Sequence, residues 1–296
     1  MTTGRGRSLA DLITDGERSF SFEFFPPRDE AGEEQLWQAV SALEPYQPTF
    51  VSVTYGAGGS SRGTTVRVTG RIARETSLTP MAHLTCVGHT RAELEAILDE
   101  YAAAGVRHVM ALRGDPQDGP RAEWTPTDGG LTYATELVEL ASARGDFRVG
   151  VAAFPEGHPT SESLDHDADV LVAKVRAGAQ FAVTQMFFRA VDYFGLVERV
   201  RSRGVGVPIL PGIMPILNLN AIKRQGDLIG TEVPAEVVAR IAAHDGDPAR
   251  MRAEGIALAA ELCDQLLDGD APGLHFYTLN RSKATLEIFE KLKITV

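Results

Sequence analysis

The chain has 296 residues, 44% of them hydrophobic and 23% charged, which excludes a disordered or fibrous protein. Asp and Glu number 40 against 29 Lys and Arg, and the resulting net charge of −11 disfavours binding to nucleic acid or to an anionic membrane. The sequence has no apolar run near the ~18 residues of a membrane span, no signal-peptide core and no paired cysteine motif, so we expect a cytoplasmic protein.

Short apolar runs alternate along the chain with longer amphipathic segments. The runs predict eight strands, at Ser19–Phe25, Thr49–Val53, Pro80–Leu84, His108–Leu112, Arg148–Ala153, Phe181–Thr184, Pro208–Pro211 and Gly273–Tyr277. Between them, the helical period is clearest at Arg91–Ala104, Leu131–Arg144 and Met251–Leu267.

Strands that alternate with helices favour parallel βα units. At this length a (β/α)8 barrel, one domain over residues 1–296, is the simplest way to close such a sheet. A doubly wound open sheet is the alternative. It usually has a glycine-rich turn after the first strand, whereas this strand ends in Phe25-Pro26-Pro27. The turn-rich segment Asp115–Gly130 is expected to lie over the barrel mouth.

The first strand carries a carboxylate at a lumen-facing position. Period-two alternation turns its phenylalanines toward the covering helices, and Ser21 and Glu23 toward the lumen. In a largely apolar cavity, desolvation would raise the pKa of Glu23, which suits a general acid. A buried glutamate paired with an arginine is the equally weighted structural alternative.

Other polar residues follow the later strands, where a barrel places its chemistry. The glycine-rich run Thr54–Ser61 can offer backbone amides to an anion, or can be a simple turn. Arg113 and Asp115 can position a heterocycle, or can pair with neighbouring charges. Gln185 can read a planar ring, and Arg281 can hold a carboxylate with two hydrogen bonds. His83, as a lone histidine, is more typical of a structural residue.

Several chemistries are disfavoured by what the sequence lacks. None of its five lysines falls on a predicted strand, which argues against a Schiff-base aldolase. Its seven histidines show neither HxH nor HExxH spacing, so we expect no metal site. A GxSxG elbow and a phosphate-binding lysine loop are both absent from the sequence.

Taken together, the strand ends resemble the 5,10-methylenetetrahydrofolate reductase family, in its single-domain bacterial form. The similarity covers almost the whole chain, and the motifs occur in the family's order. They are SFEFFPPR (21–28), FVSVTYGAGG (50–59), HLTC (83–86), ALRGDP (111–116), AAFPEGHP (152–159), VTQMFF (183–188), PGIMP (211–215) and LHFYTLNRS (274–282).

This resemblance implies a (β/α)8 barrel that reduces the methylene bridge of methylenetetrahydrofolate to a methyl group. It implies that Glu23 is the acid that protonates nitrogen 10 and that Asp115 lies beside the pterin and the hydride centre. Gln185, Tyr277 and Arg281 would bind the folate, Arg281 through its glutamate tail. The positions that match flavin contacts are Thr54, Tyr55, Ala57, His83, Arg113, Gly114, Tyr133, Ala134, His158, Asp167 and Lys174.

The cofactor is where this sequence departs from the family. Members usually pass hydride from NADH or NADPH through a bound FAD, held in part by Asn and Arg on the helix after the fifth strand. Here those positions are Val170 and Ala173, and Ala221 replaces a glutamine near the folate. Losing two charge-assisted hydrogen bonds of about 1.5–3 kcal/mol each would weaken FAD binding. We therefore favour direct hydride transfer from NADH or NADPH, with the FAD-mediated reaction as the alternative.

Two other functions fit the same predicted barrel. One is a folate-dependent lyase or transferase, which would need no nicotinamide nucleotide. The other is a folate-binding protein without turnover. The expected partners are small molecules, a folate and a nicotinamide nucleotide, and the sequence leaves a monomer and a homo-oligomer open.

Overall fold

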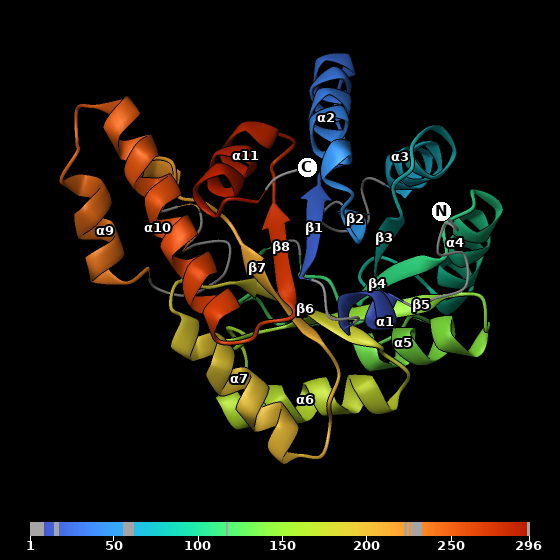
Figure 1. Ribbon diagram of the computed structural model, residues 1–296. Helices are drawn as coiled ribbons and strands as arrows, with labels where there is room; N and C mark the ends of the chain where they lie inside the picture. The colour runs from blue at the N-terminus through green and yellow to red at the C-terminus, as the bar shows by residue number, and fades with distance from the viewer. Residues whose placement is uncertain are drawn as a thin grey trace.

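The computed structural model describes residues 9–14, 18–55, 62–116, 118–221, 224, 226 and 233–294. Eight strands form one closed barrel in sequence order, and every neighbouring pair is parallel, including β1 with β8. The helices surround the strands, as Figure 1 shows. The predicted (β/α)8 barrel is therefore confirmed. The strands are β1 (Ser19–Phe24), β2 (Phe50–Val53), β3 (Pro80–Thr85), β4 (His108–Leu112), β5 (Arg148–Ala153), β6 (Phe181–Met186), β7 (Ile209–Ile213) and β8 (Gly273–Tyr277).

The described helices are α1 (Leu9–Thr14), α2 (Glu30–Leu43), α3 (Arg62–Glu75), α4 (Arg91–Ala103), α5 (Ala134–Ala143), α6 (Leu164–Arg176), α7 (Ala190–Ser202), α9 (Ala235–Ala242), α10 (Pro248–Asp268) and α11 (Ser282–Lys291), with a 3-10 turn at Glu44–Tyr46. The three helices predicted from the sequence correspond to α4, α5 and α10, each within three residues of its predicted ends. Helix α5 starts later than predicted because the Glu136 carboxylate accepts the backbone N–H groups of Thr132 and Tyr133 and so caps it. Within the described ranges, no helix is long and apolar enough to cross a membrane.

The first strand alternates as its sequence predicts. Phe22 and Phe24 are fully buried among the surrounding helices, and Phe22 packs on Phe289 of α11 with ring centroids 5.8 Å apart. On the other face, the side chains of Ser21 and Glu23 meet residues of β8 and β2 inside the barrel. This alternation delivers the predicted carboxylate to the lumen.

The lower part of the lumen is filled by apolar side chains. One buried cluster joins strand residues that include Phe50, Met81 and Phe181 with Leu9 and Ile13 of α1. Figure 1 shows α1 beside the tail of the β1 arrow, at the N-terminal end of the strands. Above this apolar layer lie buried polar side chains that include Glu23, Ser52 and His83, toward the C-terminal ends of the strands.

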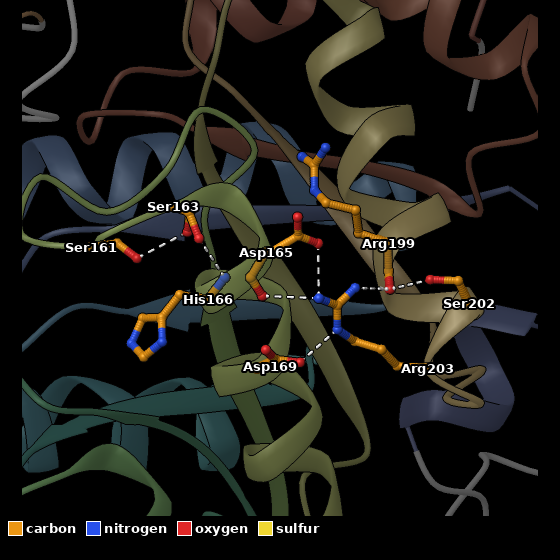
Figure 2. Close-up of polar contacts among 8 residues, drawn as sticks. All are labelled: Ser161, Ser163, Asp165, His166, Asp169, Arg199, Ser202 and Arg203. Carbon is orange, nitrogen blue, oxygen red and sulfur yellow. Dashed lines mark hydrogen bonds and ion pairs between the residues drawn. The ribbon is translucent and has the colours of Figure 1, made fainter.

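Helix α6, which carries two of the predicted site residues, is fastened to α7 by one arginine. The Arg203 guanidinium contacts Asp165 at 2.8 Å and Asp169 at 2.6 Å, one helical turn apart (Figure 2). Arg203 also donates to the backbone oxygen of Arg199 on its own helix. Because this guanidinium satisfies two carboxylates at once, it fixes the position of α6 better than a single exposed ion pair would.

Gly150 provides a test of packing inside the barrel. A Cβ atom at this position of β5 would lie 2.5 Å from the Phe181 ring, which occupies the space beside it. Gly150→Ala should therefore lower the free energy of unfolding by about 1–3 kcal/mol, measured by urea denaturation. Gly63→Ala is the matched control, because a Cβ there meets nothing within 4 Å and α3 should gain stability. Equal effects of the two changes would contradict this packing.

Candidate active site

Glu23 is the centre of a buried polar cluster in the upper lumen. Its side chain is 8% exposed, and its Oε2 atom lies 3.3 Å from His83 Nε2 on β3 and 3.5 Å from His275 Nε2 on β8. Ser52 of β2 donates its hydroxyl to the same oxygen at 3.4 Å. Four strands thus converge on one carboxylate oxygen. We call these four residues the acid cluster.

The surroundings of Glu23 differ from the apolar cavity expected from the sequence. Burial by itself raises the pKa of Glu23, but the charge of His83 and the contacts with both imidazoles outweigh it and lower the pKa to about 2. The predicted rise is therefore wrong for the free protein. The alternative of an arginine partner is also wrong, because the carboxylate faces two histidines. At neutral pH the carboxylate of Glu23 is therefore ionised.

His275 is held rigidly within the acid cluster. Its side chain is fully buried and stacks on Phe50 with ring centroids 5.6 Å apart. Its Nδ1 atom lies 2.8 Å from Ser21 Oγ, which leaves Nε2 directed at Glu23. The serine therefore fixes the orientation of the imidazole, and the Nε2 atom is placed at ion-pair distance from the carboxylate without a hydrogen bond of its own in the described structure.

Tyr277 lies next to the acid cluster and braces the lumen. Its hydroxyl donates to the Thr184 backbone oxygen at 2.7 Å, across from β8 to β6. Burial and the nearby Glu23 raise the pKa of this phenol well above its usual value, so it stays protonated. Gly212 of β7 makes the crossing possible, because a Cβ there would lie 2.8 Å from the hydroxyl. Tyr277, which the resemblance predicts to bind folate, therefore has a fixed side chain whose hydroxyl proton is already used in the bond to Thr184.

A second cluster, which we call the basic cluster, forms at the ends of β4 and β5. It contains Arg113, His158 and Lys174, with Asp167 among them. Their charges act on one another: burial and Arg113 lower the pKa of His158. Burial lowers the pKa of Lys174 to about 8, with Asp167 opposing the shift. Three basic groups around one carboxylate make this part of the mouth suited to an anion such as a pyrophosphate.

Local bonds hold each member of the basic cluster in place. Asp167 accepts the backbone N–H of His158 at 3.0 Å, and Lys174 donates to the Ala152 backbone oxygen at 3.0 Å. The His158 ring meets Phe154 edge to face, with centroids 5.0 Å apart. One donor of the Lys174 ammonium is therefore already bonded to the protein backbone, and Arg113 is the cation with more donors left to bind a ligand.

Arg113 is placed by the long loop that follows β4. Its guanidinium lies over the Trp124 ring, 4.9 Å from the centroid, and Trp124 donates its indole N–H to the Thr132 oxygen. Gly114 has φ of +80°, and a Cβ there would lie 2.4 Å from Val87, so only glycine fits. Asp115 stays 58% exposed and 3.9 Å from Arg113, free to meet a ligand at the mouth.

The remaining predicted contacts are dispersed. Thr54 and Tyr55 follow β2, and the Tyr55 hydroxyl lies 3.1 Å from His89 Nε2. Ala57 falls outside the described residues. Tyr133 is exposed before α5, where Ala134 is buried. Gln185 accepts the N–H of Met186 through its own side-chain oxygen. Within the described residues, none of these side chains forms a hydrogen bond or an ion pair with a member of either cluster.

The corner after β8 brings Arg281 to the mouth. Leu279 and Asn280 both have left-handed backbones, with φ of +52° and +57°. Outside glycine this conformation costs about 1–2 kcal/mol per residue, so neighbouring contacts must hold it. Arg281 itself is exposed, and its guanidinium has no hydrogen-bond or ion-pair partner within the described part of the chain. A free cation at this place can bind a carboxylate.

Exposed apolar side chains surround the same opening. The large hydrophobic residues that are exposed in the described ranges all lie just after strands or at the first turns of the following helices: Phe25, Tyr133, Leu164, Val191 and Leu279. Side chains of this kind at a barrel mouth suit a ligand with flat aromatic parts.

Three residues of this region escaped the sequence interpretation. His275 and Ser52 belong to the acid cluster. Both occupy lumen-facing positions of their strands, and strand alternation alone could have revealed this orientation. Glu156 follows β5, and its Oε2 atom is buried without a hydrogen-bond partner in the described structure. Burial and Asp192, opposed by Arg189, raise the pKa of Glu156 to about 7.

The raised pKa of Glu156 should appear in the stability of the protein. A carboxyl that titrates at about 7 when folded and near 4.5 when unfolded stabilises the fold below the lower value, and this contribution is lost as the pH rises through 7. Glu156→Gln has an uncharged side chain at every pH. As the pH rises from about 4.5 to about 8, the variant should therefore become progressively more stable than the unchanged protein. Denaturant titrations across this range measure the difference.

The control for this comparison is Glu162→Gln, which removes a carboxylate from an exposed position of the same loop. As an exposed substitution, it should leave the free energy of unfolding within about 0.5 kcal/mol of the unchanged protein throughout the titration. A Glu156→Gln variant that behaves in the same way would contradict the buried, desolvated carboxyl.

Comparison with known proteins identifies the family. The family model for methylenetetrahydrofolate reductase matches residues 8–293. The 5,10-methylenetetrahydrofolate reductases of Pectobacterium carotovorum subsp. carotovorum and Escherichia coli (strain K12) are each 36% identical over 97% of this chain and 94% of their own length. Methylenetetrahydrofolate reductase (NADH) 1 of Arabidopsis thaliana is 36% identical over 96% of this chain, which spans 50% of that protein.

A solved structure shares the fold at low identity. It is an uncharacterised protein from Clostridium thermocellum that binds two copies of 5-methyl-5,6,7,8-tetrahydrofolic acid. Its TM-score is 0.66 at 11% identity, covering 96% of this chain and 99% of that one. The match of the family model over nearly all residues, together with relatives of this similarity, shows that the chain belongs to the methylenetetrahydrofolate reductase family.

Proposed function

We propose that the chain reduces 5,10-methylenetetrahydrofolate to 5-methyltetrahydrofolate, with hydride supplied by NADH or NADPH. The observation that carries this proposal is the acid cluster, a buried carboxylate between two imidazoles at the open end of a reductase-family barrel. A site of this kind can deliver a proton to a nitrogen in a place from which bulk water is largely excluded.

The proton step begins from the ionised carboxylate. The Nε2 atoms of His83 and His275 lie 3.3 and 3.5 Å from Glu23 Oε2, and a bound folate that displaces water would favour protonation of the carboxyl through one of these rings. Glu23 then protonates nitrogen 10 of the folate. The bond from nitrogen 10 to the methylene carbon breaks, and the electrons of that bond stay on nitrogen 10. A nitrogen 5 iminium remains.

The hydride step completes the reaction. Hydride leaves the reduced nicotinamide and adds to the methylene carbon, which yields the methyl group and the oxidised nucleotide. One proton and one hydride are consumed, so the atoms and charges balance. Asp115, exposed beside the mouth, is proposed to lie near the iminium and to favour its positive charge. Gln185, Tyr277 and Arg281 are proposed to bind the pterin and the glutamate tail.

The basic cluster is proposed to receive the nucleotide. Arg113 and His158 would face its pyrophosphate, and Thr54, Tyr55, Ala57, His83, Gly114, Tyr133, Ala134, Asp167 and Lys174 would border it. In the family FAD carries hydride between nicotinamide and folate. Its fit here is weakened because Val170 and the exposed Ala173 offer no polar group and Lys174 already donates to Ala152. We therefore favour direct transfer, with the FAD-mediated reaction as the second candidate.

Removing the acid should abolish most of the turnover. Glu23→Gln keeps the size of the side chain but cannot donate a proton in the same way, so the rate of methylenetetrahydrofolate-dependent NADH oxidation should fall by about 10²–10⁴-fold. Glu30→Gln, at an exposed position of α2, is the control and should keep full activity. Near-normal turnover in Glu23→Gln would reject the assigned role. Folate binding without any NADH oxidation in the unchanged protein would instead favour a binding protein, lyase or transferase.

The visible spectrum separates the two hydride routes. For direct transfer, the purified active protein should lack the flavin absorption band near ~450 nm, and added FAD should leave its rate unchanged. A band that corresponds to one flavin per chain would establish the FAD-mediated route, whereas activity without flavin would support direct transfer.

A further inference from the structure

The β8 corner, residues Thr278–Arg281, is a strained turn held by side-chain hydrogen bonds, of which Asn280 makes two. Two consecutive left-handed residues that are not glycine, Leu279 and Asn280, occur here and at no other pair of described positions. Strain of this kind persists only where the surroundings determine it, and it is concentrated at functional sites. The corner lies between the folate-facing Tyr277 and Arg281, so its shape sets where the Arg281 side chain begins.

Asn280 connects this corner to the end of β1. Its Oδ1 atom accepts the backbone N–H of Phe25 at 2.7 Å, and its Nδ2 atom donates to the Phe25 oxygen at 2.9 Å. The side-chain amide thereby satisfies both backbone groups of one residue, as a neighbouring strand would. Gln35 of α2 adds a third link by donating to the Asn280 backbone oxygen at 3.0 Å.

The same corner is bonded directly to the residue that carries the acid. The Thr278 hydroxyl donates to the Glu23 backbone oxygen at 2.6 Å and accepts the N–H of Asn280 at 3.2 Å. The Arg281 N–H in turn donates to the Thr278 oxygen at 2.9 Å. The backbones that carry the acid and the free cation are therefore joined through a short set of hydrogen bonds.

We propose that Asn280 is a positioning residue that fixes the distance between Glu23 and Arg281, so that a folate whose tail is bound by Arg281 has its reacting nitrogen at the acid. This inference rests on the proposed function, because it requires a substrate with a carboxylate tail. An amide suits the task since it offers a donor and an acceptor together. Aspartate offers only acceptors and would repel the Phe25 oxygen, and glycine would accept the turn but lose both bonds.

The test compares two substrates. One is methylenetetrahydrofolate, and the other is the corresponding methylenetetrahydropteroate, which lacks the glutamate. With the first, Asn280→Gly should raise KM by about tenfold or more with a smaller change in kcat, because a misplaced Arg281 binds the tail poorly. With the second, Asn280→Gly should have no effect on KM. Asn280→Asp keeps the bond to the Phe25 N–H. Its KM for methylenetetrahydrofolate should lie between those of the unchanged protein and of Asn280→Gly.

A double-mutant cycle provides the second measurement. In an Arg281→Ala protein, which has already lost the tail contact, adding Asn280→Gly should not raise KM further. Equal increases with both substrates, or a full additional increase in the Arg281→Ala protein, would show a general structural role and overturn the proposal. An active protein whose KM is unchanged by Asn280→Gly overturns this proposal alone. A protein that oxidises no NADH with methylenetetrahydrofolate refutes the proposed function and this inference with it.

Discussion

The contact between one carboxylate oxygen and two imidazoles is the interaction on which the upper barrel depends. Glu23 is buried where an isolated charge would be strongly disfavoured, and it remains ionised only because His83 and His275 approach it from two other strands. Each imidazole needs its own support, which for His275 comes from Ser21 and the Phe50 ring. The requirement to stabilise one charge thus determines the identity of side chains on several strands.

The barrel divides its open end into two regions of different chemistry. Strands β8, β1, β2 and β3 contribute the acid cluster, and the ends of β4 and β5 with α6 contribute the basic cluster. Helix α6 serves the second region and is braced from outside by Arg203. The proposed reaction, which joins a neutral, protonatable heterocycle with an anionic nucleotide, would use these two environments side by side.

Much of this arrangement could be predicted from the sequence, because strand alternation has a fixed period. The alternation of Ser19–Phe24 was sufficient to direct Glu23 inward, and the strand order followed from regular βα units. The electrostatic environment could not be predicted in this way. Which side chains meet Glu23 depends on the register between strands, and Ser21 aligns with His275 only once the barrel has closed. The raised pKa of Glu156, in the loop after β5, likewise depends on Asp192, which belongs to α7.

The helix α1 at the N-terminal end has a further consequence. Leu9 and Ile13 complete an apolar plug with Phe50, Met81 and Phe181, so the interior is closed from below. In the proposed reaction, both reactants would then reach the acid cluster from the C-terminal ends of the strands. If hydride passes directly between them, they would occupy this end together, and the one bound deeper could not depart until the other had gone. The plug would thereby give the proposed cycle an order of release that does not depend on the affinity of either ligand.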